Sequence, residues 1–388
     1  MRHVHARMWW PVYVPALLLG VPAQASFVLL PLYVLDLGGS AAAAAAVIGW
    51  RGVGMMVMDI PAGMIAARWG EKTAMVLAGL LIGLAFLAYA VNDSIGWFYV
   101  IAFLNGAGSS TFLLGRMAYV SANLSGAERG RVIAMIAGSL RLAALLGPLA
   151  GGALAHVVGY SATFAVAGAS ILVGLACIAF VAEGGRGQGR ALTWRGIGSL
   201  ALEHRRDFAT YGVAAISFML MRAARTVLLP LAGAALGLDA PAIGFVVSVS
   251  AAVDVALFYP AGIAMDRYGR RATAVPSSCL FALALGAIAL ADSYAALLAV
   301  AVLLGFANGL STGIVMTLGT DLAPPDKRGE YLGLWRLLTD LGTAAGPMVV
   351  SSVVALAPLP LAALATAGLG AGGSFVVYRY VRETLVRH

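Results

Sequence analysis

One segment of this chain occurs twice, and the repeat constrains the fold more than any other feature of the sequence. The run from Pro61 to Lys72 returns 199 residues later as the run from Pro260 to Arg271, and both begin with Pro-Ala-Gly and end in a short basic turn. Three further pairs of segments keep this spacing: Val28–Leu32 with Val227–Leu231, Arg129–Gly130 with Arg328–Gly329, and Gly147–Pro148 with Gly346–Pro347. Four motifs in one register without gaps predict two homologous halves.

The composition places both halves in a membrane. Of the 388 residues, 61% are hydrophobic and 11% are charged, and the mean hydropathy is +0.91. A soluble globule of this composition could not cover its apolar surface. The net charge of +8 follows the turns between apolar segments, so we expect no nucleic-acid partner. Cys177 and Cys279 both lie in apolar runs and predict no disulfide.

A membrane-spanning helix needs about 20 apolar residues, and on this measure the chain contains twelve such segments. They are expected near residues 9–36, 41–66, 73–92, 96–122, 131–155, 161–182, 208–236, 241–265, 272–291, 295–320, 329–356 and 360–380. The predicted fold is an all-α membrane protein with two pseudo-symmetric six-helix bundles, at residues 1–183 and 208–388. The polar segment 184–207 is the predicted linker, and a short surface helix is expected within it.

The basic residues predict the orientation. Of the 25 Lys and Arg residues, 19 lie at the termini or in alternate turns. The other turns carry acids instead: Asp36, Asp93, Asp239 and Asp292. By the positive-inside rule, both termini and the basic turns face the cytoplasm, as expected of a multi-pass protein of the cell (inner) membrane.

The duplicated turn has a recognisable pattern. In the second copy a glycine is followed, after three residues, by an acid, a base, a glycine and further bases: Gly262, Asp266, Arg267, Gly269, Arg270 and Arg271. This turn resembles the signature of the major facilitator superfamily between its second and third helices. The first copy keeps four of these positions and has Ala67 at the acidic one; the four are Gly63, Arg68, Gly70 and Lys72.

The resemblance implies that the acid and base of this turn lock against a carboxylate at the end of the fourth helix of the same half. That position is Asp321 in the second half and Ala122 in the first. We therefore expect a charge relay of Asp266, Arg270 and Asp321 in the second half only.

A second resemblance lies on the fifth helix, where Gly147-Pro148-Leu149-Ala150-Gly151-Gly152 is similar to the superfamily's antiporter motif. Glycine permits close helix contact and proline bends a helix, so the fifth helix is expected to rock against the eighth. Ala134 and Ala143 stand where the fuller motif has glycines, and plain small-residue packing is the alternative reading.

Nine ionisable residues lie inside the apolar segments: Arg51, Arg116, Arg141, Arg222, Arg225, Arg336, Asp59, Asp254 and Asp340. Such groups are costly in hydrocarbon and tend to face a cavity. Asp59 lies about 12 Å and Arg336 about 10 Å from their cytoplasmic helix ends, and Arg141 and Asp254 lie about 15 and about 18 Å deep.

We expect Asp59 with Arg336, and Asp254 with Arg141, to pair between the halves and to break during transport, with Asp340 as a further acid of this set. A carboxylate that loses its cation in a low dielectric takes up a proton more easily, which would couple transport to protons. Static pairs that only hold the helices together are the alternative.

Among the ionisable residues inside the apolar segments, arginines outnumber acids, and this excess indicates the charge of the substrate. Arg222 and Arg225 share a face of the seventh helix near the middle of the bilayer, where transporters bind substrate. Six arginines and three acids leave three cations, which favours an anionic or zwitterionic small molecule. Arg116, Arg51 and Gln24 are the other binding candidates. Alternatively, Arg116 and Arg225 snorkel to water, which would reduce the surplus to one.

These features predict a secondary active transporter that alternates access, most simply a monomeric proton-coupled exporter of a small organic compound. Proton-coupled import of an organic anion is the alternative. An intramembrane enzyme is disfavoured because the five histidines lie at termini or helix edges and no metal-ligand spacing occurs, so we expect no catalytic residue, metal or cofactor. A channel fits the doubled gating turn less well than alternating access does.

Overall fold

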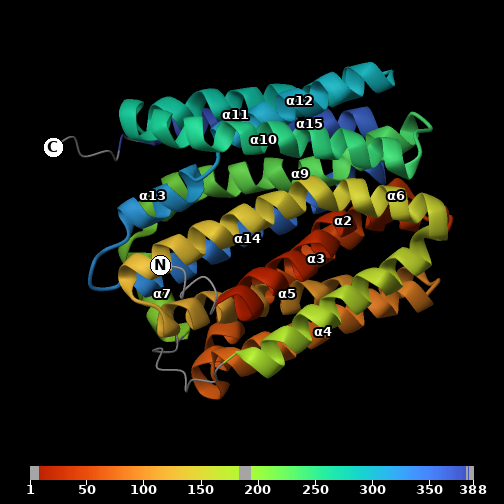
Figure 1. Cartoon of the computed structure of the whole chain (residues 1–388). Helices are drawn as coiled ribbons and strands as arrows, with labels where there is room; N and C mark the ends of the chain where they lie inside the picture. The colour runs from red at the N-terminus through yellow and green to blue at the C-terminus, as the bar shows by residue number, and fades with distance from the viewer. Residues whose placement is uncertain (1–7, 183–193, 382, 384–388) are drawn as a thin grey trace.

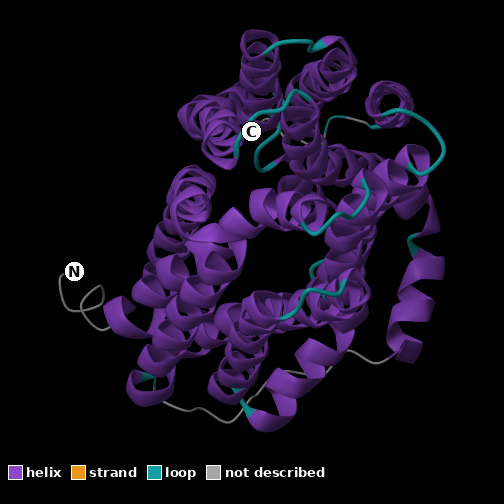
Figure 2. Ribbon diagram, turned by 90° about the vertical axis from the view of Figure 1, so that its right-hand side faces the viewer, coloured by secondary structure: helices purple, strands orange, loops and turns teal. Residues whose placement is uncertain are grey.

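The computed structural model describes residues 8–182, 194–381 and 383 (Figure 1). Nearly all of these residues are helical, and no strand occurs in these ranges (Figure 2). Residues 184–193 of the predicted linker and both ends of the chain lie outside the described residues. The bundle boundaries at 183 and 208 therefore stay a prediction.

The first half begins with a π-helical turn and continues through long helices. Its elements are η1 (Trp9–Tyr13), α2 (Val14–Asp36), α3 (Ala41–Trp69), α4 (Glu71–Val91), α5 (Ile95–Asn123) and α6 (Gly126–Val181). The last of these reverses direction at Gly159, whose φ of +83° and ψ of 167° are not helical (Figure 1). It therefore consists of two antiparallel helices, 126–158 and 160–181.

The rest of the described chain begins with the surface helix expected in the linker, α7 (Trp194–Glu203). The following elements are α8 (Arg205–Asp207), η2 (Phe208–Gly212), α9 (Val213–Ala235), α10 (Ala240–Tyr268), α11 (Arg270–Ala287), η3 (Ile288–Leu290), α12 (Tyr294–Leu310), α13 (Ile314–Leu322), α14 (Arg328–Val354) and α15 (Leu359–Tyr380).

The spacing of 199 residues recurs in the structure. Elements η1 and η2, α2 and α9, α3 and α10, α4 and α11, and α5 and α12 begin at residues that are 199 apart. The local causes repeat as well, because Ser40 caps α3 through the amide of Ala43 and Asp239 caps α10 through the amide of Ala242. The sequence repeat is thus a structural repeat.

One predicted helix is wrong in detail. The span expected over residues 295–320 is interrupted between α12 and α13, where Gly313 has a φ of +85°. Glycine adopts this left-handed conformation without the clash that a Cβ would cause. The equivalent stretch of α5, Phe112 to Leu114, is continuous helix, so the break belongs to the second half alone.

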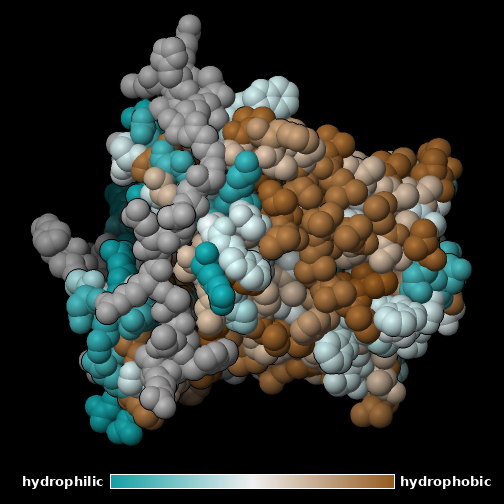
Figure 3. Space-filling model, turned by 90° about the horizontal axis from the view of Figure 1, so that it is seen from below, coloured by the Kyte–Doolittle hydropathy of each residue, from teal (hydrophilic) through white to brown (hydrophobic). Residues whose placement is uncertain are grey.

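Eleven helical segments of the described chain are long and apolar enough to cross a membrane, and one of them is Glu128–Val181 with 54 residues. Because this segment doubles back at Gly159, the count agrees with the predicted twelve. The surface carries an apolar zone between two ends where hydrophilic residues gather (Figure 3). The chain is a multi-pass membrane protein.

Two contacts between helices of different halves are the most extensive: we call that of α3 with α14 the α3–α14 seam, and that of α6 with α10 the α6–α10 seam. We call the end with the duplicated basic turns the basic end, and the end with Asp36 and Asp239 the acidic end. The α6–α10 seam is closed at the acidic end, where a Cβ on Gly152 would lie 2.5 Å from the carbonyl oxygen of Ala240.

Candidate functional site

The α3–α14 seam brings Asp59 and Arg336 together. Arg336 Nε lies 3.1 Å from Asp59 Oδ1 and 3.7 Å from Asp340 Oδ2, one turn further along α14. Ser110 of α5 donates a hydrogen bond of 2.5 Å to the same Asp59 oxygen. Both aspartates are buried, each 7% exposed. The seam thus holds two carboxylates on one guanidinium, whereas the sequence predicted a single pair.

The α6–α10 seam brings Arg141 and Asp254 together more loosely. The shortest distance between them, Nη1 to Oδ1, is 3.9 Å. Asp254 instead accepts hydrogen bonds from Asn308 (2.7 Å) and Thr312 (3.2 Å) in its own half. The Arg141 guanidinium lies 3.7 Å from the centre of the Phe258 ring. Arg141 is therefore held mainly by an aromatic face.

A cavity of about 170 Å³ lies between the halves, and Phe27, Arg51, Arg222 and Thr226 are among its lining residues. Arg51 Nη1 donates to Ser26 Oγ at 3.1 Å, and its guanidinium lies 4.4 Å from the centre of the Phe27 ring. Arg222 Nη2 donates to the carbonyl oxygen and to Oγ of Ser311, each at 2.8 Å. Ser311 lies at the break between α12 and α13.

An adjoining cavity of about 50 Å³ is lined in part by Gln24 and Arg225, and Phe27 and Thr226 line both cavities. Arg225 Nη1 lies 3.5 Å from Ser250 Oγ, at the limit of hydrogen-bond distance.

The two arginine–serine contacts are equivalent in the repeat. Residues 26 and 225 correspond, as do residues 51 and 250, so the arginine and the serine have exchanged places between the halves. Each half thus supplies one guanidinium to the central cavities at this level.

Of the six arginines inside the spanning segments, two lie within 4 Å of a described carboxylate, Arg141 and Arg336. The other four have no carboxylate within 4 Å among the described residues: Arg51, Arg116, Arg222 and Arg225. Three of them line the central cavities. Arg116 lines neither, and it is 5% exposed, with its guanidinium 5.7 Å from the centre of the Phe112 ring. Burial of Arg116 goes against the alternative that this side chain snorkels to water. The cation surplus around the cavities therefore comes from Arg51, Arg222 and Arg225.

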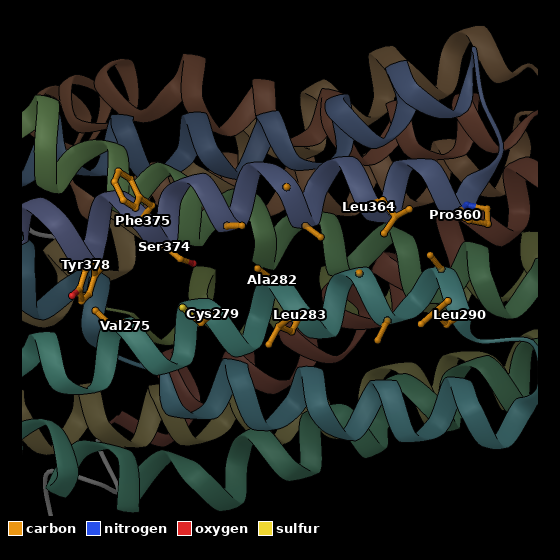
Figure 4. A pocket seen from close by; sticks show the side chains of 16 residues that line it. Val275, Cys279, Ala282, Leu283, Leu290, Pro360, Leu364, Ser374, Phe375 and Tyr378 are labelled. Carbon is orange, nitrogen blue, oxygen red and sulfur yellow. The ribbon is translucent and has the colours of Figure 1, made fainter.

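A more voluminous hollow, about 1000 Å³, lies elsewhere, on the surface between α11 and α15 (Figure 4). Its lining has no charged residue; Ser374 and Tyr378 carry the polar groups among mostly aliphatic side chains. Such a groove suits lipid chains better than a polar solute, so we place the candidate site at the central cavities.

The second basic turn forms the expected relay. Arg270 Nη1 lies 3.1 Å from Asp266 Oδ1, and Arg270 Nε lies 3.3 Å from Asp321 Oδ2. Sequence reasoning missed Glu383, whose carboxylate accepts from the amides of Arg270 (2.8 Å) and Arg271 (3.1 Å) and so caps α11. The residue lies 113 positions from the amide that it caps, and no local pattern indicates this contact.

The first basic turn lacks such a relay. Neither Arg68 nor Lys72 forms an ion pair within 4 Å with a described residue. Gly70 and Gly269 keep equivalent positive φ values of +87° and +106°, so the backbone turn is retained without the charges. In both halves the first glycine of the signature, Gly63 or Gly262, has open space at its Cβ position. Arg267 lies over the ring of its neighbour Tyr268.

The antiporter-like motif on α6 faces two partners. A Cβ on Gly147 or Gly151 would lie 2.8 Å from atoms of α2, in the same half. Gly152 faces Ala240 of α10 in the other half, and the carbonyl oxygen of Pro148 would lie 2.3 Å from a Cβ on Gly244. The motif thus makes close backbone contacts both inside its half and across the α6–α10 seam.

Outside the spanning helices, Lys327 Nζ lies 2.8 Å from Glu203 Oε2 and ties α7 to the start of α14. The hydrogen bond from Lys327 lowers the pKa of Glu203, and the same bond raises the pKa of Lys327. Both side chains are exposed, so solvent screens this pair.

Comparison with known proteins agrees with this architecture. The multidrug resistance protein MdtH of Photorhabdus laumondii is 25% identical over 328 residues, which are 82% of this chain and 80% of that protein. The structure of the nucleoside transporter NupG superposes with a TM-score of 0.78 at 14% identity, covering 98% of this chain and 100% of that chain.

The human organic anion transporter MFSD10 superposes with a TM-score of 0.70 at 16% identity, covering 96% of this chain and 99% of that chain. The sequence profile of the Major Facilitator Superfamily matches residues 16–208 and 210–387. With the duplicated halves and twelve spanning helices described above, these matches show that the chain belongs to the Major Facilitator Superfamily of membrane transporters.

Proposed function

We propose that this chain exports a small organic anion or zwitterion in exchange for protons, by alternating access across the cell's inner membrane. The observation that carries the substrate class is the set of three guanidiniums, Arg51, Arg222 and Arg225, that line the central cavities without a carboxylate partner among the described residues. A buried cation is costly unless an anion or a well-placed hydrogen-bond partner compensates it. The neutral partners Ser26, Ser250 and Ser311 compensate it only partly.

An anionic group on the substrate would complete this site. Guanidinium groups bind carboxylates and phosphates through two parallel hydrogen bonds, and they do so most strongly where water is excluded. Phe27, which lines both cavities, offers an apolar face next to Arg51 for the body of the molecule. MFSD10, a structural relative, is named as an organic anion transporter, which supports the same substrate class.

Rocking of the halves would couple transport to protons. Residues 1–183 and 208–388 are the proposed moving units, and the two seams carry acid–base contacts between them at Asp59–Arg336 and Asp254–Arg141. A carboxylate parted from its cation binds a proton more readily. The basic end and both termini would face the cytoplasm.

Export is favoured over import by two observations. In the antiporter-like motif, Gly152 contacts α10 across the moving seam, and the relative MdtH is named as a multidrug resistance protein. Proton-coupled import of an organic anion is the second candidate, because the arginine-lined cavities suit uptake of an anion equally well.

The test begins with a thermal-shift screen of the purified protein against anionic, zwitterionic and cationic compounds. Anionic or zwitterionic compounds should stabilise the wild type, and Arg222→Gln should lose most of this stabilisation. Selective stabilisation by cations that is unchanged in Arg222→Gln would refute the substrate class.

The compound with the largest shift is then added outside proteoliposomes that enclose a pH-sensitive dye. Protein is reconstituted in one orientation, with the basic end inside. Exchange of external compound for internal protons makes the interior more alkaline, whereas symport makes it more acidic. Interior alkalinisation supports antiport, acidification supports the import alternative, and compound uptake without any pH change refutes proton coupling.

A further inference from the structure

The repeat relates the two seams residue by residue. Asp59 corresponds to Phe258, and Asp340 corresponds to Arg141, with the same spacing of 199 residues. In the α6–α10 seam these two positions touch, because the Arg141 guanidinium lies over the Phe258 ring. In the α3–α14 seam the same two positions both carry an aspartate. The internal symmetry therefore places two acids where the other seam has a cation on an aromatic ring.

The charges of the α3–α14 seam do not balance. Arg336 is shared by Asp59 and Asp340, at 3.1 and 3.7 Å from its Nε. The two carboxylates and one guanidinium leave one negative charge at a place where the acid side chains are 3% and 11% exposed. Oδ2 of Asp59 and Oδ2 of Asp340 are buried and have no hydrogen-bond partner. One proton would neutralise the excess and satisfy both oxygens.

Within the part of the chain that the structure describes, no other charged group compensates the excess. The charged groups that meet in this seam are Asp59 from α3 and Arg336 and Asp340 from α14, and α5 contributes the hydroxyl of Ser110. The neighbouring apolar contact of Ile60 with Leu334 is packed against side chains of α7 and η2 that carry no charge.

We propose that Asp59 and Asp340 share a single proton in this conformation, and that this shared proton is the one exchanged during transport. Two carboxylates that share a buried site hold one proton between them, because ionising both is costly. The proton forms an O–H bond with one Oδ2 and a hydrogen bond to the other. When the halves part along the α3–α14 seam, it leaves to water and both carboxylates become hydrated. The role in exchange rests on the proposed antiport function.

A metal cation fits this site less well than a proton. Hard cations take six or more oxygen ligands, or keep several waters. Here the ligands would be the four carboxylate oxygens and Ser110, and Arg336 already occupies one side of them. No group of three or more metal-ligating side chains occurs among the described residues.

Infrared difference spectroscopy of the purified full-length protein tests the shared proton without a substrate. The wild type at neutral pH should show the carbonyl band of a buried protonated carboxyl group, which shifts in D₂O. Asp340→Asn and Asp59→Asn should each abolish the band, because the remaining acid is then neutralised by Arg336. Asp254→Asn is the matched control and should keep it.

A second variant covers the case in which an asparagine variant does not fold. Arg336→Gln removes the cation, so both acids should be protonated and the band should gain about twofold in intensity. A wild type without the band, or an Asp340→Asn protein that keeps it, overturns the proposal. A thermal-shift response to sodium chloride over choline chloride that Asp340→Asn removes would also overturn it, in favour of a sodium site.

The proteoliposome assay then separates this inference from the proposed function. If the wild type moves its stabilising compound without protons, the antiport function is refuted. If the wild type exchanges protons and Asp340→Asn exchanges them at the same rate, antiport stands and the shared proton is not the coupling proton. Loss of at least tenfold of the proton flux in Asp340→Asn, with flux retained in Asp292→Asn, which changes an exposed acid of the turn before α12, supports the inference.

Discussion

A methyl group at Gly152 should shift the balance between the two conformations of the transporter. The Cβ of an alanine there would lie 2.5 Å from the carbonyl oxygen and 3.0 Å from the carbonyl carbon of Ala240, while ordinary contacts begin at 3.4 Å. Both neighbours are backbone atoms at the start of α10, so no side chain can rotate away. The seam must open by roughly 1 Å, and overpacking of this kind costs about 1–3 kcal/mol.

This cost applies only while the acidic end of the α6–α10 seam is closed. Since the open conformation lacks the contact, Gly152→Ala should raise the open population by about 5- to 150-fold, provided that this population is small in the parent protein. The matched control is Gly138→Ala on the same helix, where an added Cβ meets no atom within 4 Å. That substitution should leave the balance unchanged.

The assay is the labelling rate of a single cysteine at Ile243 in purified protein whose native cysteines have been replaced by serine. Ile243 is 1% exposed and is packed between the halves against Val28 and Leu32. A thiol there reacts with maleimide only when the seam opens, so its rate reports the open fraction. An unchanged rate in Gly152→Ala, or an equal rise in Gly138→Ala, would refute the reasoning.

Three further changes test other contacts. Gly313→Ala forces a residue with a Cβ into the left-handed conformation, which costs about 1–2 kcal/mol, so it should lower the unfolding midpoint in a thermal scan. The control Gly372→Ala, with open space around its Cβ position, should leave the midpoint unchanged. Equal midpoints of the two variants would contradict the helix break. Glu383→Gln weakens the cap of α11 by about 1 kcal/mol and should speed amide hydrogen exchange of Arg270 about fivefold, and unchanged exchange would exclude the cap. Lys327→Met should lower the unfolding midpoint only slightly, and only above the usual pKa of glutamate. Because Lys327 lowers the pKa of Glu203, the stability that this pair contributes is lost as the pH falls and Glu203 is protonated. A large drop of the unfolding midpoint in Lys327→Met at acid pH would contradict this pH dependence.

Much of the architecture follows from the sequence, because the bilayer restricts the chain to helices of a set length. The repeat fixed the correspondence of the halves, and the helix starts at residues 41 and 240 or 71 and 270 obey it. The break at Gly313 was missed because hydropathy does not depend on backbone dihedrals, although Ser311-Thr312-Gly313 is a turn-forming triplet that the first half replaces with Phe112-Leu113-Leu114.

The site was predictable in its membership and less so in its contacts. Counting charges along the helices identified the arginines and aspartates, but the depth of a residue along a helix does not show to which side of the helix its side chain points. Asp340 thus appeared as a spare acid, whereas it shares Arg336 with Asp59. Arg116 appeared as a cavity residue, whereas it lines neither central cavity. Whether these residues bind substrate and protons stays a prediction.

The position of Phe27 has a consequence for how cargo is admitted. Its ring borders both central hollows, of about 170 and about 50 Å³, whereas drug-sized ligands occupy pockets of about 300–1000 Å³. A molecule of that size fits only after the Phe27 side chain rotates away or the two bundles separate. Substrate binding and the conformational change therefore occur together. Phe27→Ala should join the two cavities and widen the size range of the molecules that bind. It should also weaken the coupling between substrate entry and the rocking of the two halves.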